Sequence, residues 1–134
     1  MDLEDMKARG LALRRELFGA ATVEKRMTAA GAFGQPLQDM INAYAYGGLW
    51  QRPGLSPKLR SLTMIAMMAA AGRPNELRVH LTGGRKNGVT AEEVREVLLQ
   101  VALYCGLPLS IEAHTIAHEV YGAAASPATP AEND

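Results

Sequence analysis

Apolar residues recur at steps of three or four along most of this chain, which is the spacing of one face of an α-helix. The first such series consists of Leu3, Met6, Gly10, Leu13 and Leu17. Runs of β-branched residues, and hairpin turns between alternating segments, are nearly absent. The pattern therefore predicts an all-α fold of six to seven helices, the first of which ends at Gly19.

Capping residues, prolines and glycines set the ends of the other predicted helices. Thr90 and Glu93 form a capping box, and Pro57 and Pro74 suit the first turn of a helix. We expect the remaining helices at residues 22–30, 36–46, 57–72, 74–86, 90–105 and 108–121. One domain is expected over residues 1–122. The tail, 123–134, lacks a periodic apolar pattern and is predicted to be disordered.

Two segments carry more apolar surface than one small helical bundle covers. The helix 57–72 is apolar almost all round, and the stretch Tyr44–Trp50 is rich in aromatic residues. This excess favours obligate assembly into a homo-oligomer. A compact monomer whose helices wrap the central one explains the same pattern equally well.

Composition excludes several classes of function. Fourteen basic residues balance fourteen acidic ones, so no overall field attracts nucleic acid or a membrane surface. The apolar run 62–71 is shorter than the roughly 20 residues that a membrane span needs. The acidic start does not resemble a signal peptide, and a single cysteine, Cys105, suits a reducing compartment. A cytoplasmic protein is expected.

The most informative chemical feature is the pair Glu76 and His80, which follows the apolar run. Residues four apart share one face of a helix, so the carboxylate can orient the imidazole and favour its charged form. Beside an apolar wall, such a pair forms a buried acid–base couple. The alternative is an ordinary pair on the protein surface.

Five motifs, in order and similarly spaced, resemble the gamma-carboxymuconolactone decarboxylase family over roughly residues 3–121. They are 47–55 (GGLWQRPGL), 60–62 (RSL), 75–80 (NELRVH), 87–93 (NGVTAEE) and 104–108 (YCGLP). This family is similar in fold to the alkyl hydroperoxidase D proteins. The resemblance implies an all-helical homo-oligomer, a trimer or hexamer, with active sites near subunit interfaces.

The two families form a superfamily, and its thiol-dependent branch carries two cysteines at the positions of Arg73 and Glu76. Dithiol exchange needs one thiolate to attack and a second thiol to resolve the intermediate. With Cys105 as the only cysteine, this chain cannot perform that chemistry.

The resemblance implies instead that the protein decarboxylates 4-carboxymuconolactone to the enol-lactone of 3-oxoadipate. This carboxylated lactone arises in protocatechuate breakdown by the β-ketoadipate pathway. The electron pair left by carbon dioxide spreads through the ring alkene into the lactone carbonyl. Because the substrate is its own electron sink, no cofactor and no metal are expected.

Roles for the site residues follow from that reaction. Protonated His80 is the predicted proton donor, oriented by Glu76, which raises its pKa. Arg52 is the candidate clamp for a substrate carboxylate, since guanidinium pairs with carboxylates in a bidentate manner. A purely structural loop arginine is an equally good reading.

Further residues are weaker candidates for the pocket. Tyr46 and Trp50 could form its walls, although Trp50 suits interface packing better. Ser61 replaces a glutamate of the thiol branch and could line the site. His114 and His118 have the i, i+4 spacing of metal ligands, but a solvent-facing pair is the simpler interpretation.

Departures from the family pattern make the substrate uncertain. They occur at Gly48, Pro36, Ile111 and Glu112, where the family carries other residue types. Two alternatives therefore remain open. The chain could be a paralogue that acts on another lactone or enolisable acid, or a non-catalytic oligomeric protein that binds such a ligand.

Overall fold

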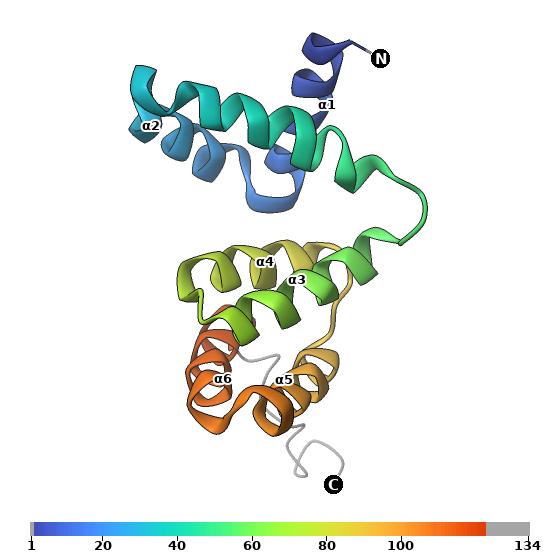
Figure 1. Cartoon of the computed structure of the whole chain (residues 1–134), viewed down its shortest axis with the longest axis vertical. Coiled ribbons are helices and arrows are strands. Elements are labelled where there is room, and N and C mark those ends of the chain that lie inside the picture. Colours follow the sequence, from blue (N-terminus) through green and yellow to red (C-terminus); the bar gives the residue numbers. More distant parts are fainter. Residues whose placement is uncertain (1, 123–134) are drawn as a thin grey trace, which may run out of the picture. The chain divides into compact units, whose positions relative to one another are not determined.

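The structure, a computed structural model, describes residues 2–122 and confirms the all-α prediction (Figure 1). Its described part contains no strand. The helices are α1 (Leu3–Phe18), α2 (Ala20–Met40), α3 (Pro57–Ala71), α4 (Pro74–Lys86), α5 (Ala91–Cys105) and α6 (Leu107–Tyr121). A π-helix, Ile41–Tyr46, follows α2, and a short 3-10 helix occupies Leu49–Gln51. None of the described helices is long and apolar enough to cross a membrane.

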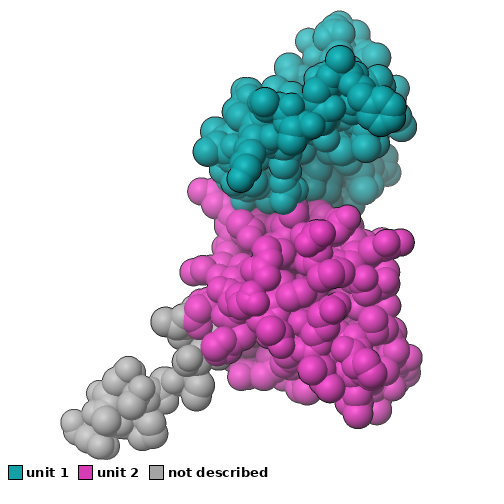
Figure 2. Space-filling model, turned by 90° about the vertical axis from the view of Figure 1, so that its left-hand side faces the viewer, with its two compact units in different colours: residues 1–60 teal, residues 61–134 magenta. Residues whose placement is uncertain are grey.

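The chain forms two compact units, residues 1–60 and 61–134 (Figure 2), and each is described here by itself. The helix α3 begins in the first unit and continues in the second. A single domain over residues 1–122 stays a prediction. The predicted disordered tail, 123–134, lies outside the described residues.

Unit 1 is built around a close approach of α1 to the π-helix. A Cβ on Gly10 would overlap the backbone carbonyl of Asn42, so only glycine allows this spacing. One turn further along α1, the buried side chain of Arg14 donates hydrogen bonds to Asn42 Oδ1 at 2.8 Å and Gln38 Oε1 at 3.0 Å. Burial lowers the pKa of Arg14. A charged side chain that is not part of the apolar series of this helix is thus buried in unit 1.

The region around Gly31 confirms one predicted boundary and corrects another. Helices were expected at 22–30 and from Pro36 onward. A break at Gly31 divides the helical segment Ala20–Met40 in two, which agrees with the predicted end at residue 30, but the second helical stretch begins before Pro36. The φ angle of Gly31 is 59°, in a region that glycine adopts without steric cost. Pro36 therefore lies inside helical structure, and the predicted helix end at Tyr46 is a π-helical segment.

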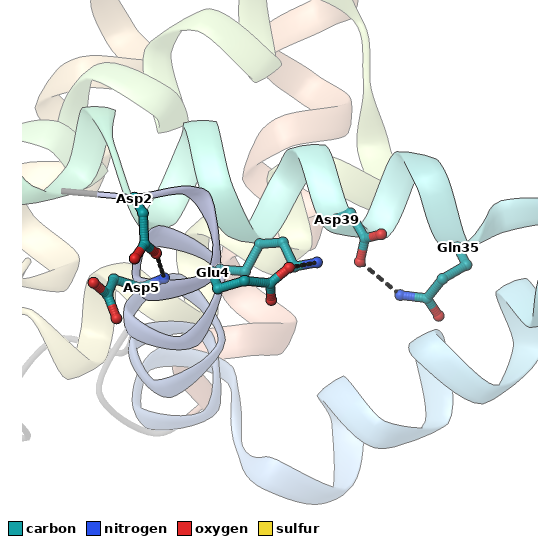
Figure 3. Close-up of polar contacts among 6 residues, drawn as sticks. Asp2, Glu4, Asp5, Gln35 and Asp39 are labelled. Atoms are coloured by element: carbon teal, nitrogen blue, oxygen red, sulfur yellow. Dashed lines mark hydrogen bonds and ion pairs between the residues drawn. The ribbon is translucent and has the colours of Figure 1, made fainter.

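Side-chain hydrogen bonds stabilise the helix ends and faces of unit 1 (Figure 3). The Asp2 carboxylate accepts a hydrogen bond from the backbone N–H of Asp5 at 2.8 Å and so caps α1. On α2 the Gln35 amide donates to Asp39 Oδ1 at 2.8 Å. Both contacts satisfy polar groups locally and leave the apolar faces for packing.

Unit 2 contains the main apolar core, which α3, α4, α5 and α6 share (Figure 1). Its most deeply buried large side chains are Ile65, Leu81 and Leu98. A Cβ on Gly84 would come within 3.2 Å of Ile65 Cδ1, so this glycine allows α4 to lie close against α3.

The capping box that opens α5 is present as predicted. Thr90 Oγ1 accepts from the backbone N–H of Glu93, and the Glu93 carboxylate accepts from that of Thr90.

The end of α6 is fixed to the loop before α5 by Tyr121. Its hydroxyl donates a hydrogen bond to the carbonyl of Val89 at 2.8 Å, and the Arg85 guanidinium lies 5.3 Å from the centre of its ring. Burial raises the pKa of Tyr121 to about 12. The phenol is therefore neutral and held in place, and its ring packs beside the Arg85 guanidinium.

Candidate functional site

The helix α4 carries the predicted acid–base pair, and its sequence favours a helix at both ends. Pro74 occupies the first turn, where the missing N–H costs no hydrogen bond. Glu76 lies in the first turn, and Arg85 and Lys86 lie in the last, so their charges complement the helix dipole. The chain in this region folds as predicted.

His80 is buried on the inner face of α4, where only 8% of its surface is exposed. Leu77, Leu81 and Gly84 share that face and belong to the interior of unit 2. Burial at this position shields the imidazole from bulk water.

Glu76 differs from the prediction in its surroundings. Its side chain is exposed at the start of α4, one turn before His80. Of the expected buried couple, only the imidazole is buried. Leu77, the next residue of the same turn, is buried, so the side chain of Glu76 lies on the face of the helix that is turned away from the core.

Ser61 lies in unit 2 and is almost fully buried near the start of α3. Its hydroxyl oxygen accepts a hydrogen bond from Asn87 Nδ2 at 3.0 Å. Asn87 directly follows α4, so this bond ties the beginning of α3 to the end of the helix that carries His80. Asn87 belongs to the motif 87–93, but the sequence alone did not indicate this contact.

The other predicted site residues belong to unit 1. The ring of Tyr46 stacks on that of Trp50 with centroids 5.5 Å apart, and Phe18 meets Tyr46 edge-on at 5.6 Å. Burial raises the pKa of Tyr46 to about 12. These rings form the core of a small unit, while Arg52 is exposed in the loop before α3.

The remaining candidates lie on α5 and α6. Tyr104 and Cys105 line an apolar hollow of about 290 Å³ between α3 and α5. His114 and His118 are both exposed on α6. Within residues 2–122 there is no group of three or more His, Cys, Asp or Glu side chains that could hold a metal ion.

Comparison with known proteins decides the family. The model of the carboxymuconolactone decarboxylase family matches residues 35–119, which include α4 and every predicted site residue. The chain belongs to this family. It is 40% identical over 121 residues, 90% of each chain, to the 4-carboxymuconolactone decarboxylase of Acinetobacter baylyi. It is also 40% identical over 104 residues to the nitrosuccinic acid decarboxylase of Metarhizium robertsii, covering 78% of this chain and 73% of that one.

Membership of the carboxymuconolactone decarboxylase family fixes the class of reaction. Both relatives are decarboxylases by name, and this member of the family is accordingly a carboxy-lyase. Their substrates differ, however, although each relative is 40% identical to this chain. The shared fold thus serves more than one carboxylic acid within the family.

Proposed function

We propose that this protein removes carbon dioxide from 4-carboxymuconolactone and yields the enol-lactone of 3-oxoadipate, with His80 as the proton donor. The similarity to the Acinetobacter baylyi enzyme, over nine-tenths of both chains, is the observation that carries this proposal. The burial of His80 on α4 supports the role of that residue.

The reaction divides into two steps that need no external electron acceptor. The bond between the ring carbon and its carboxylate breaks. The electron pair then moves through the ring alkene onto the carbonyl oxygen of the lactone. His80 then delivers a proton to the carbon next to the lactone carbonyl, and the enol-lactone results, which keeps the second carboxylate of the substrate. The protein must bind the carboxylates, stabilise the oxyanion and supply this proton.

The remaining site residues support those tasks. Glu76 lies one turn before His80 on α4 and orients the imidazole through the charge of its carboxylate. Arg52 is exposed and available to pair with a substrate carboxylate in a bidentate manner. Ser61 positions α3 against α4, and Tyr46 and Trp50 keep the loop that bears Arg52 in place.

Assembly of several copies completes the proposed enzyme, a cytoplasmic homo-oligomer (trimer or hexamer). Two groups of apolar side chains are more than half exposed. One follows α2 and the π-helix at steps of three and four; the other lies around the junction of α5 and α6. The groups are Phe33, Leu37, Met40 and Tyr44, and Leu103, Tyr104, Leu107 and Ile111. Stable monomers rarely leave such surface uncovered.

A second candidate function has its own support. The relative from Metarhizium robertsii is named for nitrosuccinic acid, in which a nitro group and a carboxylate share one carbon. When carbon dioxide leaves, the electron pair that remains on the carbon can be delocalised into a nitro group, as it can into a lactone with a conjugated alkene. The protein could therefore act on another acid whose own substituent is the electron sink.

Parallel assays of the purified protein with the two acids test the proposal. We expect 4-carboxymuconolactone to be converted with a kcat/KM at least about 100-fold above that for nitrosuccinate, since polar groups matched to one substrate are left unpaired by the other. Carbon dioxide release and NMR of the product give both rates. The reverse preference would contradict the proposal in favour of the second candidate, and binding without turnover of either acid would indicate a ligand-binding protein.

A further inference from the structure

A pocket between α5 and α6 lies apart from the residues assigned to decarboxylation. It has a volume of about 110 Å³, and its lining includes the apolar side chains of Val94, Leu98 and Ala117 and the ring of Tyr121. Because the hydroxyl of Tyr121 is bonded to Val89, its ring adds to the apolar surface. For comparison, an engineered apolar cavity of about 150 Å³ binds benzene.

Apart from the bonded hydroxyl of Tyr121, the polar side chains that line this pocket are basic. Arg95 lines it from α5, and His114 and His118 line it from α6. All three residues are exposed, so the pocket is open to solvent on the side where they lie. An apolar floor with a rim that can carry positive charge matches a molecule with an apolar body and one anionic end.

Hydrogen bonds hold one of these imidazoles in a defined orientation. His114 Nδ1 lies 2.8 Å from the backbone carbonyl of Ser110, to which it donates. The Ser110 hydroxyl is itself fixed, because it donates to the carbonyl of Leu98 at 2.6 Å. The second nitrogen of His114, Nε2, is left for a ligand, and it donates to a carboxylate when the ring is protonated.

We propose that this pocket binds a small carboxylic acid with an apolar body, such as an aromatic acid, whose carboxylate pairs with Arg95 and the two imidazoles. A guanidinium binds a carboxylate in a bidentate manner, and hydrogen bonds to charged groups are the strong ones. A metal ion fits the same residues less well. Arg95 repels a cation, and zinc takes four ligands in structural sites and three in catalytic ones. The described part of the chain offers no such group of donors here.

Histidine NMR on the full chain tests the proposal, with benzoate as the probe. The sequence contains three histidines, so the Cε1–H signals separate the two of the pocket from His80. We expect saturable shifts of the His114 and His118 signals and little change of the His80 signal. Benzamide, a neutral molecule of nearly the same shape, should bind far more weakly.

Two variants separate recognition from general electrostatic attraction. Arg95→Gln should raise the Kd for benzoate by about tenfold or more, because a charged hydrogen-bonding partner is lost. Lys86→Gln removes the same charge at an exposed position that does not line the pocket, and it should leave the Kd nearly unchanged. Arg95 is exposed, so neither variant is expected to disturb folding.

Four results would overturn the proposal. They are shifts confined to His80, equal effects of the two variants, equal affinity for benzamide and benzoate, and a response of His114 and His118 to zinc chloride but not to benzoate. The first would place the acid in the proposed catalytic site, and the last would identify a metal site. Because His80 is observed separately, the outcome is distinct from that of the turnover assays.

Discussion

Replacing His80 by Gln lowers kcat for 4-carboxymuconolactone by about 10²- to 10⁴-fold, the usual contribution of a positioned general acid. Glutamine keeps a polar side chain in the buried position but cannot deliver a proton at neutral pH. The carbanion left by the loss of carbon dioxide then has to take its proton from water, and water is excluded from the interior face of α4. Single-turnover measurements of product formation give the rate of this step without product release.

A control on the same helix separates loss of the acid from damage to α4. Thr82 is exposed, and its hydroxyl donates a hydrogen bond back along the helix to the carbonyl of Arg78. Thr82→Ala should therefore leave kcat nearly unchanged. His80→Ala should regain part of its activity with added imidazole, because the removed ring leaves room for it. A His80→Gln protein that is folded and fully active would remove His80 from the reaction.

Replacing Gly10 by Ala lowers the free energy of unfolding by about 3 kcal/mol, at the upper end of typical overpacking costs. In an ordinary helix position this change stabilises by up to about 1 kcal/mol, because alanine has the higher helix propensity. Here the new methyl group would overlap the carbonyl of Asn42. The π-helix would have to move away from α1, which also breaks the contact between Arg14 and Asn42.

Thermal unfolding followed by circular dichroism checks this prediction, with a fall in Tm of more than about 10 °C expected. Gly54 provides the matched control in the same unit. A Cβ at that position meets open space, and Gly54 is not among the described glycines with positive φ. Gly54→Ala should stay within about 0.5 kcal/mol of the parent. Equal Tm values for the two variants would contradict the close approach of α1 to the π-helix.

Local signals in the sequence were sufficient for most of the helical framework. The capping box of Thr90 and Glu93, the first-turn Pro74 and the glycine after α5 each act within a few residues, so their effects can be read directly. The segment around Gly31 was harder. The helix end at residue 30 was predicted, but the next helical stretch begins directly after Gly31 and not at Pro36, and no capping residue before Pro36 indicates this start.

Long-range contacts limited the prediction of the site. The burial of His80 could be predicted because its apolar neighbours are adjacent in the sequence. The bond between Ser61 and Asn87 joins residues 26 apart, and the pocket of Arg95 and His114 depends on how α5 packs on α6. Such contacts follow from the tertiary fold, which the spacing of apolar residues does not specify. The exposure of Glu76 was missed for the same reason.

The most direct test of proton delivery by His80 is the fate of deuterium during turnover in heavy water. The carbon next to the lactone carbonyl gains one hydrogen from the acid, so an acid fixed on one side of the ring delivers it to one face only. We predict one deuterium per product molecule at that carbon, in a single configuration. Because the two configurations are mirror images, NMR with a chiral solvating agent distinguishes them, before the enol-lactone exchanges or hydrolyses. An equal mixture of the two configurations, formed at the full enzymatic rate, would show that the carbanion is protonated by solvent and would contradict the account.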